Sequence, residues 1–170
     1  MMEPTPTSQT ITTDGFQLHP EDEAAMREEA AHYEQPQAAC IEALKIVQRR
    51  HGWVPDEAIA AIARVLGVGP ASVEGVATFY SLIFRQPVGR HVILVCDSSS
   101  CFLTGFDQLL DALAERLGIG LGETTVDGRF TLLPVCCLGA CDGAPAMMID
   151  DDVFGPVGAE DLADVLEGYS

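Results

Sequence analysis

Residues 91 to 101 read HVILVCDSSSC and indicate how the second half of the chain folds. After its first residue, the run from His91 to Cys96 is apolar and rich in β-branched side chains, as in a buried strand. A second such run, GRFTLLPVC, covers residues 128 to 136. Residues 104 to 118, TGFDQLLDALAERLG, lie between the two and have the apolar period of an amphipathic helix. The order strand, helix, strand predicts two neighbouring parallel strands.

The C-terminal segment continues this alternation of short elements. Residues 144 to 150 and 152 to 157 read as a hairpin about an acidic turn at residues 150 to 152, and residues 158 to 169 read as a last helix. Short strands and helices alternating from residue 91 onward fit a small α/β layer of thioredoxin-like type. We therefore expect residues 86 to 170 to form a thioredoxin-like domain.

The N-terminal half reads as helices preceded by a tail. Residues 1 to 18 are rich in Thr, Pro and Ser and show no period, so they predict a flexible tail. Residues 19 to 85 predict a small helical bundle, with helices at 20 to 36, 36 to 51, 55 to 66 and one starting near residue 68. Cys40 falls on an apolar helix face and is predicted to be a core residue. The fold class is therefore α/β in the broad sense, or α+β, with the helical bundle first.

The charge of the chain argues against nucleic acid as a partner. The sequence has 9 Lys and Arg residues against 26 Asp and Glu residues, a formal net charge of −17, which repels a phosphate backbone. Ala63, Gly67 and Val73 do match the small, turn and apolar positions of a helix-turn-helix module. The second helix of that module offers Glu74 and no Lys or Arg, so an acidic DNA-binding regulator is disfavoured.

The lack of a recognisable targeting signal and the cysteine content predict a cytoplasmic chain. No apolar run approaches the roughly 18 to 20 residues that cross a bilayer, so no direct membrane insertion is expected. The N-terminal residues lack the order of a secretory signal, and no Lys or Arg precedes Arg27, unlike a mitochondrial presequence. Six cysteines in a cytosolic chain of this size favour metal ligation or redox chemistry over a disulfide framework.

Two pairs of cysteines follow the two predicted parallel strands. Cys96 and Cys101 flank four residues, and Cys137 and Cys141 flank three. Because the carboxyl ends of parallel strands meet at one edge of a sheet, we expect four thiolates to converge there, none of them from a helix interior. Successive strand residues point to opposite faces, so only one of Cys136 and Cys137 faces this edge, and spacing does not choose between them.

The spacing favours a [2Fe–2S] cluster and leaves structural zinc open. Four-cysteine zinc sites usually have two to four residues between the cysteines of a pair, and both pairs of this chain satisfy that spacing. The wider loops suit a cluster whose two irons each take one pair of thiolates, and the small residues in both loops let backbone N–H groups approach the sulfurs. None of the histidines, at positions 19, 32, 51 and 91, lies in either loop, which disfavours a Rieske centre.

Several contiguous phrases resemble the E-subunit family of respiratory complex I, the NADH:quinone oxidoreductase. They are CDSSSC, VDGRFTLLPVCCLGAC, ACIEALKIVQRRHGWVP, VEGVATFYS and FRQPVGRHV, and the resemblance runs from about Tyr33 to Met148. It implies a helical N-terminal part followed by a thioredoxin-like domain with one [2Fe–2S] cluster. The implied ligands are Cys96, Cys101, Cys137 and Cys141, which leaves Cys136 as a neighbour and Cys40 outside the site.

The resemblance also implies the function. The chain would be an electron-transfer subunit that exchanges single electrons with FMN in a companion subunit, with no catalytic residue of its own. FMN and NAD are expected only in that companion, because this chain has no Gly-rich phosphate fingerprint after a strand and no P-loop. No NADH oxidation is therefore expected from the isolated chain.

The resemblance to a complex I subunit also implies a location in the cell. Three alternatives to this function stay open. The companion subunit and the rest of the peripheral arm would attach the chain to the inner membrane from the bacterial cytoplasm. One alternative is a homologous subunit of an NAD-linked hydrogenase or formate dehydrogenase. A zinc-stabilised interaction module and an acidic regulator are alternatives from other classes.

Overall fold

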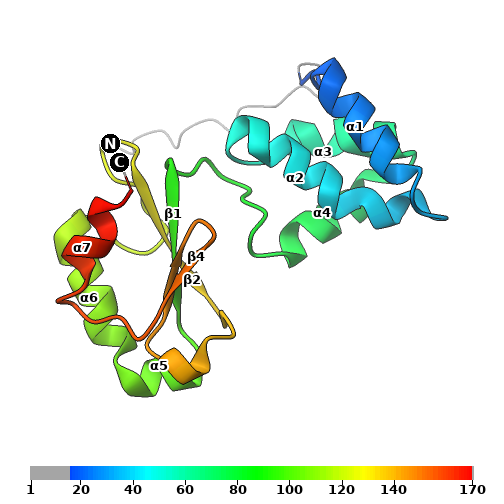
Figure 1. The fold of residues 1–170 in the computed structure, drawn as a ribbon. Helices are drawn as coiled ribbons and strands as arrows, with labels where there is room; N and C mark the ends of the chain where they lie inside the picture. The colour runs from blue at the N-terminus through cyan, green and yellow to red at the C-terminus, as the bar shows by residue number, and fades with distance from the viewer. Residues whose placement is uncertain (1–15, 170) are drawn as a thin grey trace, which may run out of the picture. The chain divides into compact units, whose positions relative to one another are not determined.

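A computed structural model describes residues 16 to 169 of the chain. The chain divides into two compact units, one ending at Gln86 and one beginning at Pro87 (Figure 1). Residues 1 to 15 of the predicted flexible tail lie outside the described residues, whereas Phe16 and Leu18 pack against the core of the first unit. No helix within residues 16 to 169 is long and apolar enough to span a membrane.

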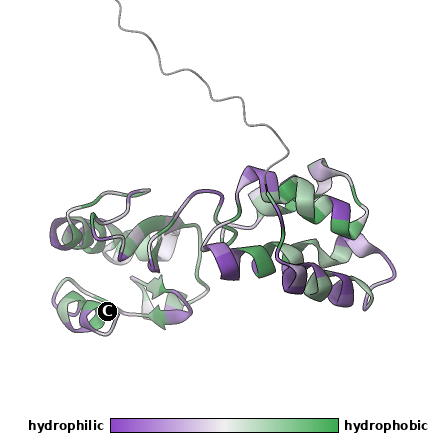
Figure 2. Cartoon of the chain, turned by 90° about the horizontal axis from the view of Figure 1, so that it is seen from above, coloured by the Kyte–Doolittle hydropathy of each residue, from purple (hydrophilic) through white to green (hydrophobic). Residues whose placement is uncertain are grey.

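The first unit is built from four α-helices. They are α1 (Pro20–Ala30), α2 (Cys40–His51), α3 (Asp56–Leu66) and α4 (Pro70–Phe79). Each carries both hydrophobic and hydrophilic residues (Figure 2). Buried hydrophobic residues from all four helices form one core. Cys40 is 1% exposed in that core, which confirms its predicted place. Gly52 and Gly67 end α2 and α3 with φ angles of 80° and 69°, a conformation that favours glycine.

The first helix is shorter than predicted, because the sequence pattern places its end near Pro36. Helix α1 stops at Ala30, and a 3₁₀ turn at Pro36–Ala39 precedes α2. Gln35, directly before the proline, is extended with φ −116° and ψ 117°. The ring of a proline disfavours helical backbone in the residue before it, which separates α1 from α2 at this point. It does not set the end of α1, which lies five residues before Gln35.

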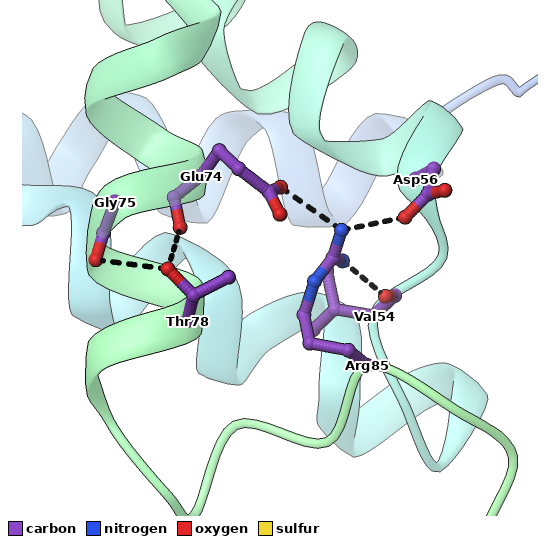
Figure 3. Close-up of polar contacts among 6 residues, drawn as sticks. All are labelled: Val54, Asp56, Glu74, Gly75, Thr78 and Arg85. Atoms are coloured by element: carbon purple, nitrogen blue, oxygen red, sulfur yellow. Dashed lines mark hydrogen bonds and ion pairs between the residues drawn. The ribbon is translucent and has the colours of Figure 1, made fainter.

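Hydrogen bonds of Arg85 and Gln48 hold the segment after α4 against the helices. The Arg85 guanidinium donates to the Val54 carbonyl at 2.5 Å, to Asp56 at 2.6 Å and to Glu74 at 2.9 Å (Figure 3). Its side chain is 18% exposed. The Gln48 amide donates to the Leu82 carbonyl and accepts from the Phe84 N–H. Arg85 is therefore a largely buried cation that ties the end of the unit to α3 and α4.

The second unit is a four-stranded sheet with three short helices. Its strands lie in the order β2 (Phe130–Val135), β1 (His91–Cys96), β3 (Met147–Ile149) and β4 (Asp152–Phe154). Strands β1 and β2 are parallel, and β3 and β4 form an antiparallel hairpin, as predicted. The hairpin lies beside β1, a position that the sequence does not predict. Helices α6 (Phe106–Leu117) and α7 (Leu162–Glu167) lie on the same side of the sheet in Figure 1 and share a core with it. Helix α5 (Ser99–Thr104) follows β1.

Candidate iron–sulfur centre

The two cysteine pairs lie at one edge of the sheet. Cys96 is the last residue of β1, and its register partner Val135 is the last residue of β2. The backbone N–H of Asp97 donates to the Val135 carbonyl at 3.0 Å, so the two chains are still paired as they leave the sheet. The expectation that both cysteine segments begin at the same edge is therefore confirmed.

The expectation that no cysteine of the group comes from a helix is wrong for Cys101. Ser98 is extended and precedes α5, in which Cys101 is the third residue. Serine favours the position before a helix, and the Phe102 N–H donates to the Ser98 carbonyl at 2.8 Å to close the first turn. This turn buries Cys101 to 1% exposure next to Cys96, which is 2% exposed.

The four predicted thiols interact with one another. Cys96 hydrogen-bonds Cys101, and Cys137 hydrogen-bonds Cys141. Cys141 also experiences the charge of Cys96, and Cys101 that of Cys141, so the two pairs form one group. Cys136 is exposed, and no interaction with these thiols is found for it within the described residues.

Burial and neighbouring groups shift the pKa values of Cys96, Cys101 and Cys141. Burial raises the pKa of Cys96, but hydrogen bonds from the backbone of Ser98 and Leu138 and from Cys101 outweigh it, and the net shift is downward. Burial and then the bond to Cys96 raise the pKa of Cys101. The bond to Cys137 and its charge raise the pKa of Cys141. Four adjacent thiolates repel one another, and bound metal ions remove that repulsion.

Backbone and hydroxyl donors surround the sulfurs. The Gly139 N–H donates to Cys137 Sγ at 3.4 Å, the backbone of Ala146 hydrogen-bonds Cys101, and the Ser100 hydroxyl hydrogen-bonds Cys141. Gly139 has a φ of 79°, which lets the chain turn sharply between the two cysteines of its pair. Hydrogen bonds to thiolate sulfurs stabilise their negative charge and raise the potential of a bound cluster.

The donor set fits a binuclear cluster. The thiols occur as two hydrogen-bonded pairs that interact with each other. Two pairs of thiolates are what a [2Fe–2S] cluster requires, one pair for each iron.

Comparison with known proteins identifies the class of protein to which this fold belongs. Residues 26–170 match the family described as thioredoxin-like [2Fe-2S] ferredoxin, and the chain belongs to it. Its cofactor is a [2Fe–2S] cluster, as predicted. The fold also resembles the NAD⁺-reducing [NiFe]-hydrogenase in its H₂-reduced state, with a TM-score of 0.66 and 22% identity. That match covers 80% of this chain and 23% of the hydrogenase chain.

Within that class, the nearer relatives are subunits of one enzyme. The chain is 59% identical over 162 residues to the E subunit of NADH-quinone oxidoreductase from Pseudomonas aeruginosa, covering 95% of this chain and 98% of the relative. Identity to the corresponding subunit of Escherichia coli K12 is 55% with the same coverage. The chain belongs to the E-subunit family of NADH-quinone oxidoreductase, and the predicted resemblance is confirmed.

One backbone donor of the site, Ala146, escaped prediction. The backbone donor Leu138 lies in the loop between Cys137 and Cys141, from which backbone N–H groups were predicted to approach the sulfurs. Ala146 lies 45 positions after Cys101 and comes near it because β3 pairs with β1, which places the Ala146 carbonyl 3.1 Å from the Cys96 N–H. The predicted hairpin was the one sequence feature that could have indicated the contact of Ala146 with the site, but it does not show where the hairpin lies in the sheet.

Proposed function

We propose that Cys96, Cys101, Cys137 and Cys141 hold one [2Fe–2S] cluster and that the chain thereby carries electrons within an NADH-quinone oxidoreductase. The observation that supports this most is the interaction between the two thiol pairs at the edge of β1 and β2. The zinc-stabilised alternative has the same donors but lacks support from the family, whose cofactor is a cluster.

The proposed site has an inner side formed by a buried cysteine pair and an outer side formed by an exposed pair. When bound, the cluster accepts and returns one electron at a time. Cys96 and Cys101 are buried, and hydrogen bonds from Ser98, Leu138 and Ala146 hold their sulfurs in place. Cys137 and Cys141 are exposed, so the outer side is where a redox partner approaches. This asymmetry orients electron exchange toward the solvent-facing pair.

The electron donor belongs to another subunit. The chain has no Gly-rich phosphate-binding fingerprint and no P-loop, so nothing in its sequence accounts for binding FMN or NAD. We infer that the flavin and NADH sites lie in a companion subunit, with this chain in the bacterial cytoplasm and attached to the inner membrane through the complex. The identities of 59% and 55% to the relatives from Pseudomonas aeruginosa and Escherichia coli favour this assembly over a hydrogenase or formate dehydrogenase.

Anaerobic purification of the full chain tests the proposal. We expect iron and acid-labile sulfide in equal amounts, visible absorption that dithionite bleaches, and an EPR signal in the reduced state. The reconstituted chain alone should oxidise no NADH, and electrons should reach its cluster from NADH once the purified flavin-bearing subunit is added. Colourless protein with bound zinc, or NADH turnover by the chain alone, would contradict the proposal.

A further inference from the structure

A groove of about 680 Å³ lies beside the proposed cluster site in the second unit. Residues from α5, from the start of α6 and from the segment between β4 and α7 line it. Those that matter for its chemistry are Phe102, Leu103, Asp107, Pro145, Val157 and Glu160. None of the four proposed ligands lines the groove, so it is a separate feature of this edge.

Two large apolar side chains at the groove are exposed to solvent. Phe102 is 57% exposed and Leu103 84% exposed, and both follow Cys101 in α5. Phe102 has one aromatic neighbour among the described residues, Phe106, with ring centroids 6.4 Å apart. Adjacent exposed apolar side chains beside a concave surface are typical of a binding site that another protein covers.

The groove is connected to the cysteine site through the backbone. The Pro145 carbonyl accepts a hydrogen bond from the Val157 N–H at 3.1 Å, which holds the groove wall. The next residue, Ala146, hydrogen-bonds both buried cysteines. A molecule seated in the groove therefore lies against the same segments that hold the proposed cluster.

The charged side chains at the groove are negative. Asp107 and Glu160 are exposed at the groove, and residues 130 to 170 and 91 to 115 contain no Lys or Arg. From residue 87 onward, the cations are Arg90, Arg116 and Arg129. Arg90 and Arg129 immediately precede the two parallel strands, at the end of the sheet opposite the cysteines, and Arg116 lies in the last turn of α6.

We propose that this groove binds a segment of the flavin-bearing companion subunit that presents an apolar side chain flanked by Lys or Arg. The apolar side chain would lie against Phe102, Leu103 and Val157, and the cations would face Asp107 and Glu160. Opposite charges on the two partners speed association and fix orientation. A second copy of this chain would set one acidic groove against another, which like-charge repulsion opposes. The inference rests on the function proposed above.

Binding of the purified flavin-bearing subunit to the full chain with its cluster tests the groove. Leu103→Asp should raise the dissociation constant about tenfold or more, because it places a charge in the apolar contact. Glu160→Lys should raise the dissociation constant several-fold at low salt and make binding less sensitive to salt. The matched controls are Val126→Asp, at a fully exposed turn, and Glu115→Lys, on the exposed side of α6 outside the groove. Both should bind within about twofold of the wild type.

Each outcome decides between the groove and the function on which it rests. If the wild type binds and both Leu103→Asp and Glu160→Lys bind equally well, the groove proposal is wrong and the electron-transfer function stands. If the cluster-bearing wild type does not bind the flavin-bearing subunit, both fail. If Leu103→Asp loses its cluster absorption, Glu160→Lys decides alone. Self-association of the wild type that Leu103→Asp abolishes would assign the groove to a second copy instead.

Discussion

Cys96 and Val135 are register partners at the ends of two parallel strands, and this relationship sets the geometry of the cysteine site. The residue after each strand leaves the sheet at the same edge. Cys96 reaches the site from the strand itself, and Cys137 reaches it two residues beyond Val135. The intervening Cys136 lies on the same exposed segment without joining the group of four interacting thiols found in the described residues.

Cys137→Ser should therefore remove or badly distort the cluster, whereas Cys136→Ser should leave it intact. Serine replaces a thiolate by a harder and less acidic oxygen ligand, so one iron loses a strong donor. We expect iron content and EPR signal to fall to a small fraction of wild type in the first variant only. Cys136→Ser is the matched control, since it changes the neighbouring thiol. An unaltered EPR signal in Cys137→Ser would refute the assignment of ligands.

Much of this site was predictable because its elements are local. The β-branched run ending at Cys96, the helical period from Phe106 and the acidic turn before Val153 each identify their own element within a few residues. The parallel pairing of β1 and β2 follows from the helix between them. These features suffice to bring the two cysteine pairs to one edge.

The rest depended on contacts between distant residues. The sequence from Ser98 to Thr104 is too short to show a helical period, so it does not predict α5, whose turn is what buries Cys101. Nothing in the sequence around Arg85 predicts its burial, yet it is largely buried among groups from three segments. Neither fact has a local signal, because both arise from tertiary packing.

Asp97→Asn should raise the reduction potential of the cluster. Asp97 directly follows Cys96, and its negative charge disfavours the thiolate of that cysteine. Reduction adds a further negative charge to the site, so removing a nearby carboxylate should shift the potential upward by roughly 20 to 50 mV. EPR-monitored redox titration measures the shift, and Asp111→Asn, on the exposed side of α6, is the control. A shift to lower potential would contradict this account.

Arg85→Met should destabilise the first unit by about 1 to 3 kcal/mol, because it leaves the Val54 carbonyl without its donor and two carboxylates without their cation. Asp56 and Glu74 are more exposed than Arg85, which keeps the expected loss below that of a fully buried network. Urea unfolding followed by the fluorescence of Trp53, the single tryptophan, reports on this unit. The control is Arg49→Met, an exposed arginine on α2, which should change stability little. Equal unfolding midpoints for the two variants would show that the Arg85 contacts contribute nothing.

Asp22→Asn should make the first unit less stable at neutral pH and less sensitive to acid. Hydrogen bonds from Arg50 hold the pKa of Asp22 below its ordinary value of 3.8, although burial acts in the opposite direction. A lowered folded-state pKa stabilises the fold above the unfolded-state pKa, and this contribution is lost as the pH falls through the folded-state pKa. The stability difference between wild type and Asp22→Asn should therefore be largest near pH 7 and shrink below pH 3.8. Glu28→Gln is the control, and a difference that stays constant down to pH 2 would contradict the linkage.

Gly155→Ala should loosen the turn that carries Cys141. A Cβ atom at Gly155 would lie 2.3 Å from the Gly143 carbonyl oxygen, and Gly143 ends the 3₁₀ turn that begins at Cys141. Because the clash is with backbone, the turn must move, at a cost of about 1 to 3 kcal/mol. We expect lower iron content per chain and faster loss of iron to a chelator. Gly120→Ala, whose Cβ would meet only the Glu123 side chain at 3.6 Å, should retain the wild-type rate. If Gly155→Ala releases iron no faster than Gly120→Ala, the close approach of these two glycines does not support the cysteine site.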